Sequence, residues 1–304
     1  MEKMQRPIAA IRDDTRPGAI TLHLPYREPF DAAGILRFLG ARAVPGIEEI
    51  VDGVYRRTLR LPHGAGIVAL SAGNEAIHCV LRLADRRDLE AAVARCRRLL
   101  DLDADPTIIG AQLAADPLLA PLVQRAPGMR VPGAADGADL AIRAVLGQQI
   151  SVAGARTLAG RLVARFGAPL SAPDGGLTHL FPEPAALLTG DPARFSMPRA
   201  RVATLFRLCA ALDAGEIVLD GSVDREETVR ALLALRGIGP WTASYVAMRA
   251  LGDPDAFLPT DLGIKHAFAR LGEASDPKRI GARAERWRPW RAYATFHLWG
   301  SLSA

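Results

Sequence analysis

The sequence predicts an α+β fold, because strand patterns occupy its first third and helix patterns fill the rest. Apolar and polar residues alternate over Tyr55–Leu61 and Ile77–Leu83, as in half-buried strands, and Gly66–Leu70 is a third candidate strand. Apolar residues at helical spacing predict helices within 30–43 and 89–100. We therefore expect a small unit at the start of the chain in which helices pack on an antiparallel sheet.

From Asp105 onward the strand patterns almost vanish and helical periodicity dominates. The stretch 126–133 is rich in proline and glycine, which predicts a rigid connector. Helices are expected over Leu140–Ile150, Leu158–Phe166, Val202–Leu212 and Val229–Leu233, and in a C-terminal region that contains Trp287, Trp290 and Trp299. We assign Trp287 and Trp290 to packing.

Length and composition set broad limits on the kind of protein. The chain has 304 residues, 49% of them apolar, which is enough for two or three packed domains. Its net charge of +5 fits a nucleic-acid partner, although such a charge also serves solubility alone. No apolar run reaches the roughly 18 residues that a membrane span needs, and the start of the chain does not resemble a signal peptide.

The three cysteines, Cys79, Cys96 and Cys209, are widely spaced, and no Cys-x-x-Cys pair exists. This spacing argues against a disulfide framework, a cysteine zinc site and a four-cysteine iron–sulfur cluster. We therefore expect a protein of the reducing cytoplasm.

The segment from Leu235 to Trp241 reads Leu-Arg-Gly-Ile-Gly-Pro-Trp. It predicts a helix end, a tight turn and a new helix, with Gly237 and Gly239 allowing backbone shapes that side chains forbid, and Ile238 plugging between the helices. Backbone N–H groups in such a turn, beside a helix N-terminus, bind a phosphate oxygen without reading sequence. An ordinary corner between two helices is the alternative interpretation.

About one helix length downstream, the segment 257–266 contains Pro259, which breaks the preceding structure, and Asp261, which sits where a helix begins. Taken alone, Asp261 is explained by an N-cap role. Its distance from the glycine turn gives it a second interpretation.

Residues 235–266 resemble the helix-hairpin-helix and Gly/Pro-Asp motif of base-excision DNA glycosylases, and most closely the AlkA type of DNA-3-methyladenine glycosylase II. The likeness runs from about residue 20 to the C-terminus. It includes Phe38–Val44, Leu146–Val152, Met197–Arg201 and Ala284–Ala294.

The resemblance implies a TATA-binding-protein-like N-terminal domain followed by two all-α lobes with the active-site cleft between them. The expected parts are a polar tail at 1–17, an α+β domain at 18–107, a central helical domain at 138–253 and a second lobe made of 108–137 and 254–304. It further implies that Gly237, Ile238 and Gly239 clamp DNA phosphate and that the carbonyls near Leu235 and Ile238 hold a monovalent cation. No cofactor and no catalytic metal are implied.

By the same resemblance, Asp261 is the catalytic carboxylate. Breaking a glycosidic bond builds positive charge on the sugar. A carboxylate about 4 Å away stabilises that charge by about 4 kcal/mol at an effective dielectric constant near 20, or about a thousandfold in rate. Asp261 would act in this way or by orienting the attacking water.

The damaged base is expected to stack on Trp241, Tyr245, Trp299 and Phe38, although each of these rings could equally be a core aromatic. Related enzymes that also nick the backbone carry a lysine at the position of Trp241, so the tryptophan favours hydrolysis alone.

Gln149 matches the wedge that fills the hole left by the flipped base. The AlkA type has leucine there, so the sequence departs from it; a helix-capping role is the alternative. Arg143, Arg199 and Arg201 are candidates for phosphate contacts or for a solvated face.

The expected function is a monofunctional DNA glycosylase of base excision repair that hydrolyses alkylated bases such as 3-methyladenine and 7-methylguanine out of duplex DNA. Two alternatives remain: a glycosylase for oxidised, deaminated or mismatched bases, and a non-catalytic DNA-binding protein. We expect a monomer, and leave open that the chain is the glycosylase half of a longer fusion.

Overall fold

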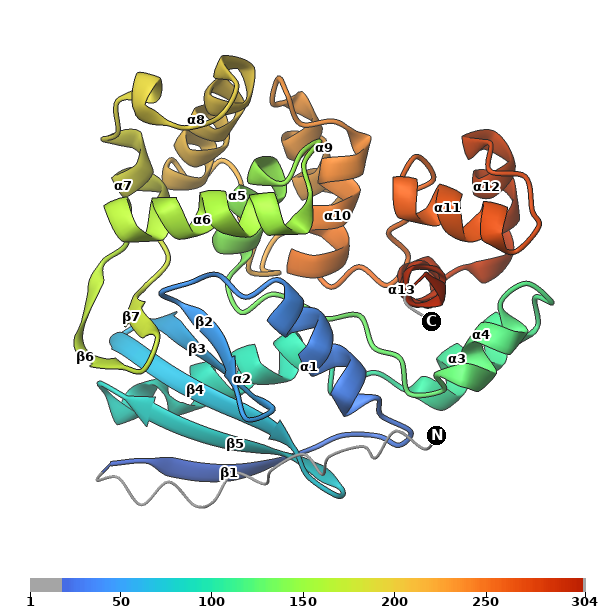
Figure 1. The fold of residues 1–304 in the computed structure, drawn as a ribbon, viewed down its shortest axis with the longest axis horizontal. Coiled ribbons are helices and arrows are strands. Elements are labelled where there is room, and N and C mark those ends of the chain that lie inside the picture. Colours follow the sequence, from blue (N-terminus) through green and yellow to red (C-terminus); the bar gives the residue numbers. More distant parts are fainter. Residues whose placement is uncertain (1–17, 303–304) are drawn as a thin grey trace, which may run out of the picture.

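The computed structural model describes residues 18–302, so the expected polar tail at 1–17 lies outside the described residues. The chain begins with a five-stranded antiparallel sheet of order β1-β5-β4-β3-β2 (Figure 1). Its strands are β1 (Ile20–Pro25), β2 (Glu48–Val51), β3 (Val54–Leu61), β4 (Gly64–Ala72) and β5 (Ala76–Leu83). The two strands expected from alternation are therefore β3 and β5, and the third candidate strand is β4.

Two helices, α1 (Ala32–Ala41) and α2 (Leu89–Leu100), pack on one face of this sheet. The residues that meet them alternate along each strand, for example Tyr55 and Leu59 on β3, as the sequence pattern requires. The three cysteines are free and buried, and Cys79 and Cys96 belong to this hydrophobic cluster.

The rest of the chain is mainly helical and shares a second hydrophobic cluster. Its α-helices are α3 (Pro106–Ala114), α4 (Ala120–Arg125), α5 (Gly137–Leu146), α6 (Val152–Phe166), α7 (Pro184–Leu188), α8 (Arg199–Asp213), α9 (Arg225–Ala234), α10 (Pro240–Ala250), α11 (Leu262–Arg270), α12 (Pro277–Ala284) and α13 (Arg291–Ser301). Helix α4 packs against α13, so a segment before α5 lies beside the end of the chain (Figure 1). Trp287 is fully buried and Trp290 partly so, in keeping with a packing role. Within residues 18–302, no helix is long and apolar enough to cross a membrane.

Two local expectations were wrong. A small hairpin of β6 (Pro169–Asp174) and β7 (Leu177–His179) follows α6, where no strand was expected. Tertiary contacts hold it, since Asp174 pairs with Arg56 of the sheet and Glu49 accepts a hydrogen bond from the Gly176 amide at 2.9 Å.

Helix α5 ends at Leu146, not at Ile150. The backbone leaves the helix because Gln149 adopts a left-handed conformation with φ of 58°.

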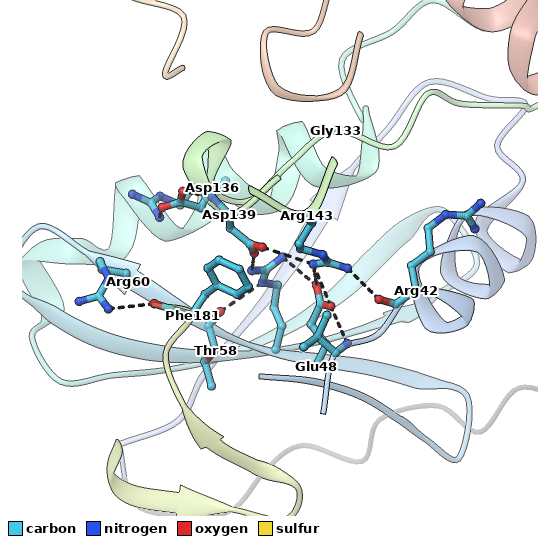
Figure 2. Close-up of polar contacts among 12 residues, drawn as sticks. Arg42, Glu48, Thr58, Arg60, Gly133, Asp136, Asp139, Arg143 and Phe181 are labelled. Carbon is cyan, nitrogen blue, oxygen red and sulfur yellow. Dashed lines mark hydrogen bonds and ion pairs between the residues drawn. The ribbon is translucent and has the colours of Figure 1, made fainter. Parts of the chain in front are cut away.

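A buried ionic cluster joins the sheet to α5 (Figure 2). Glu48 of β2 accepts hydrogen bonds from Arg57 and Arg143 at 3.2 Å each, and Arg57 also donates to Asp139 at 3.2 Å. The hydroxyl of Tyr55 donates to Glu48 at 2.8 Å. Burial alone would raise the pKa of Glu48, but Arg143 and Arg57 outweigh it and lower that pKa. The cluster therefore holds Glu48 ionised inside the protein.

We expect Glu48→Gln to lower the free energy of unfolding by about 3–5 kcal/mol, because removal of one partner leaves buried arginine charge uncompensated. Urea unfolding followed by circular dichroism measures the change. Glu75→Gln, in the exposed turn between β4 and β5 of the same sheet, is the matched control and should be nearly neutral. Equal stability of the two variants would contradict the importance of this cluster.

His297 on α13 is 4% exposed and its Nδ1 atom has no hydrogen-bond partner. Burial lowers the pKa of His297 to about 4, against a partial opposing effect of its hydrogen bond to the backbone of Leu122. As pH falls from 6.5 towards 4, His297 becomes protonated in the unfolded chain but stays neutral in the folded protein. The free energy of unfolding therefore decreases by up to about 1.4 kcal/mol per pH unit.

We expect His297→Asn to remove this part of the pH dependence, so that unfolding free energies at pH 7 and pH 5 differ less than in the wild type. Urea titrations at the two pH values measure the difference. His266→Asn, at an exposed site, should leave the wild-type pH dependence unchanged. A variant at 297 with the full wild-type slope would show that another group causes it.

Candidate functional site

A cleft of about 1070 Å³ is bordered by the turn after α5 and by the α9–α10 hairpin. The start of α11 and the last turn of α13 complete its wall. Most of the side chains expected to form the site line it. They are Gln149, Trp241, Tyr245, Asp261 and Trp299, together with the backbone of Gly237.

Asp261 caps α11 and also lines the cleft. As the N-cap of α11, its Oδ1 atom accepts a hydrogen bond from the Ile264 amide at 3.0 Å. The indole N–H of Trp299 donates to the same oxygen at 2.8 Å, and that of Trp241 donates to Oδ2 at 2.8 Å. Three donors thus fix the carboxylate in the cleft wall.

The hydrogen bonds that Asp261 already accepts determine which of its two carboxylate oxygens can accept another. A carboxylate oxygen offers about two acceptor sites. Oδ1 uses both, for Ile264 and Trp299, whereas Oδ2 uses one, for Trp241. Oδ2 is therefore the atom with an acceptor site free within the described residues.

The rings of Trp241 and Tyr245 are stacked on one another. They lie four residues apart on α10, so they project from the same face of the helix. Their planes are 5° from parallel and their centroids 5.2 Å apart. Trp299 contacts Phe296 edge-on at 5.1 Å.

Phe38 does not line the cleft as expected. Its ring contacts Phe296 at 5.2 Å and is covered by the guanidinium of Arg42, 3.7 Å from the ring centroid. Arg249 lies over the same ring at 4.9 Å. Phe38 therefore lies behind Arg42, which itself lines the cleft.

The glycine hairpin has the expected shape, with one correction. Gly237 has φ of +100°, and a Cβ there would lie 1.9 Å from Oγ1 of Thr204, so both backbone and space require glycine. Ile238 is 5% exposed and plugs the corner as expected. Gly239 was wrongly expected to need a special conformation: its φ is −97° and a Cβ would meet nothing within 4 Å.

Gln149 lies exposed at the turn between α5 and α6, next to exposed Ile150. Its neighbour Gln148, which sequence reasoning missed, donates to the Gly237 carbonyl at 3.1 Å and to Thr242 at 3.0 Å. Arg201 donates to the Gln148 carbonyl. The hydrogen bonds of Gln148 connect the turn to the hairpin. In the sequence, the only indication of this role is the second glutamine of Gly-Gln-Gln-Ile.

The three candidate phosphate-binding arginines have different surroundings. Arg143 was expected to contact phosphate or solvent, and both interpretations were wrong, because it is engaged with Glu48 and with the Arg42 carbonyl at 2.7 Å. Arg201 is partly buried against the turn, and Arg199 is exposed. The position of Arg143 in its helix could not indicate this pairing, because its partner Glu48 lies in a distant strand of the sheet.

Comparisons with known proteins agree with this geometry. The family described as the AlkA N-terminal domain matches residues 21–136. A DNA-3-methyladenine glycosylase 2 of Escherichia coli is 34% identical, over 91% of this chain and 95% of the relative. The chain belongs to the DNA-3-methyladenine glycosylase II family. Its N-terminal sheet and helical cleft are the family's fold.

Two further comparisons define the extent of the likeness. A probable bifunctional transcriptional activator/DNA repair enzyme AlkA of Mycobacterium tuberculosis is 50% identical over 94% of this chain, and the chain spans only 58% of that relative's length. The solved structure of a 3-methyladenine DNA-glycosylase from Archaeoglobus fulgidus superposes with a TM-score of 0.79, over 92% of this chain and 97% of the other, at 24% identity. That structure supports the glycosylase fold expected for residues 18–302.

The two hairpin glycines of this family member should respond differently to a methyl group. We expect Gly237→Ala to lower the free energy of unfolding by about 2 kcal/mol or more, from its left-handed backbone and its contact with Thr204. Gly239→Ala, the matched control, should unfold like the wild type because its Cβ meets open space. Thermal unfolding compares them, and equal midpoints would contradict the hairpin geometry.

Proposed function

We propose that the protein is a monofunctional DNA glycosylase that hydrolyses the N-glycosidic bond of alkylated bases flipped out of duplex DNA. The observation that carries this proposal is the position of Asp261, held at the cleft by the indoles of Trp241 and Trp299. The names of the E. coli and A. fulgidus relatives, both 3-methyladenine glycosylases, support the same reaction.

Asp261 is the proposed catalytic residue. As the bond to the base breaks, positive charge grows on the sugar, and the free acceptor site on Oδ2 faces that charge or accepts a proton from the attacking water. The fixed donors on the other sites keep the carboxylate from turning away during the reaction. Such preorganised electrostatic stabilisation is a large contribution to many enzymatic rates.

The stacked rings of Trp241 and Tyr245 are the proposed platform for the flipped base, with Trp299 beside Asp261. An alkylated purine is cationic, and a cation over an aromatic face gains about 0.5–2 kcal/mol. Trp241 stands where nicking relatives carry a lysine, which supports hydrolysis without backbone cleavage. Phe38 contributes from behind, by supporting Arg42.

Duplex DNA is the proposed partner. The N–H groups of Gly237 and Gly239, at the start of α10, suit a phosphate oxygen, while that of Ile238 between them is bonded within the turn. The Leu235 carbonyl accepts one hydrogen bond, from Ile238, and so keeps a lone pair for a monovalent cation. Gln149, exposed at the lip of the cleft, is the proposed wedge, and its amide suits hydrogen bonding to the base left without a partner.

The remaining expectations belong to the same proposal. We propose a monomer, and a cytoplasmic location in keeping with three free, buried cysteines. The domain division at 18–107, 138–253 and the discontinuous lobe of 108–137 with 254–304 is supported by the packing of α4 on α13.

We expect Asp261→Asn to slow release of 3-methyladenine from methylated duplex DNA by about a thousandfold, because asparagine keeps the N-cap but loses the charge. Release of free base under single-turnover conditions measures this. Binding to a duplex with an abasic analogue should be retained.

Asp276→Asn is the matched control, since Asp276 caps α12 in the same way but does not line the cleft. It should release base at the wild-type rate. A wild type that binds DNA and frees nothing from methylated duplexes would overturn the proposal; activity on oxidised or deaminated duplexes alone would select the alternative glycosylase, and activity on none the DNA-binding protein.

A further inference from the structure

Gly263 lies beside the hydrogen bond that joins Trp299 to Asp261. It is the second residue of α11 and lines the cleft, and α11 packs against α13, the helix that carries Trp299 (Figure 1). A Cβ atom at this position would lie 2.9 Å from Cδ1 and 3.0 Å from Nε1 of Trp299, and 3.0 Å from Oδ1 of Asp261. The indole N–H therefore reaches the carboxylate through space that the Cβ of any other residue at 263 would fill.

The backbone does not account for a glycine at this position. Gly263 lies within the α-helix Leu262–Arg270, and its φ is outside the left-handed region. Glycine inside a helix is unfavourable relative to alanine, because it loses more conformational freedom on folding. What excludes a side chain here is space alone, and the atoms that border this space belong to Trp299 and Asp261.

A methyl group at 263 would displace the indole rather than the carboxylate. Non-bonded carbon atoms pack at about 3.5–4.0 Å, so a contact of 2.9 Å to Cδ1 of Trp299 requires a shift of about half an ångström or more. Asp261 resists this shift, because the Ile264 amide and the Trp241 indole also hold it. Trp299 is only partly buried and borders the cleft, so its ring has room to move there. Its hydrogen bond to Oδ1, now 2.8 Å long, would lengthen and weaken.

We infer that Gly263 is a positioning residue: the absence of a side chain there admits the Trp299 indole to Asp261 and so holds the carboxylate in its reactive orientation. This inference rests on the proposed glycosylase function. Once the indole donor is withdrawn, Oδ1 keeps only the Ile264 amide, and the carboxylate gains freedom to tilt. A misplacement of about an ångström in an active site costs up to about a hundredfold in rate.

The test measures release of 3-methyladenine from methylated duplex DNA under single-turnover conditions with saturating enzyme. In Gly263→Ala, release should slow by about ten- to a hundredfold, while binding to a duplex with an abasic analogue is retained. Gly281→Ala is the matched control, because Gly281 lies in α12 and a Cβ there meets nothing within 4 Å. The control should release base at the wild-type rate, and thermal unfolding shows that both variants are folded.

A double-mutant cycle separates positioning of the indole from obstruction of the cleft. Trp299→Phe keeps an aromatic ring but removes the N–H donor, and it should itself slow release. If Gly263 acts through the indole, Gly263→Ala should add little to the loss that Trp299→Phe already causes. If the methyl group instead blocks entry of the base, the two losses should add in full.

Tryptophan fluorescence provides a readout that does not depend on catalysis. Gly263→Ala should shift the emission to longer wavelength, because the Trp299 ring moves towards the solvent of the cleft. The same substitution should cause no shift in the Trp299→Phe background, where this indole is missing. The spectra therefore report the place of the indole even if no base is released.

Four results would overturn the inference. They are release by Gly263→Ala at the wild-type rate, losses that add in full with Trp299→Phe, weaker binding of the abasic-analogue duplex, and an unchanged emission spectrum. Each of them leaves the proposed function standing as long as the wild type releases base. A wild type that releases none defeats the proposed function and, with it, the catalytic consequence inferred for Gly263.

Discussion

The buried ionic cluster around Glu48 sets the position of the cleft. It fastens α5 to the edge of the sheet through Arg143 and Asp139, and the turn that follows α5 forms one lip of the cleft. Gln148 in that turn donates to the hairpin, so a charge buried in the sheet is connected through α5 to the backbone of the α9–α10 hairpin. Such clusters resist displacement because a lone buried charge is costly.

Asp261 illustrates how one residue serves folding and chemistry together. A helix N-cap needs a short side-chain oxygen aimed at free backbone N–H groups, and a catalytic carboxylate needs to be held in one orientation. The hydrogen bond from the Ile264 amide to Oδ1 caps α11 and also fixes the orientation of the carboxylate. The indole of Trp241 on α10 holds the other oxygen, Oδ2. The capping and catalytic interpretations of this residue are compatible.

The cleft combines aromatic rings with charged groups. The rings of Trp241 and Tyr245 are stacked on one another, and the indole of Trp241 also donates to Asp261. The hydroxyl of Tyr245 accepts a hydrogen bond from Arg249. Helix α10 thus supplies both the aromatic pair and one of the donors that hold the carboxylate.

The sequence by itself determined the strands that alternate, the helices that have a clear apolar face, the hairpin at Gly237 and the helix start at Asp261, because each depends on neighbours a few residues away. Only the tertiary structure decided the partners of Arg143, the place of Phe38 behind Arg42 and the β6–β7 hairpin. Their partners lie in distant parts of the chain, so no local pattern encodes them. For the same reason the indole donors that hold Asp261 became visible only when α10, α11 and α13 were brought together.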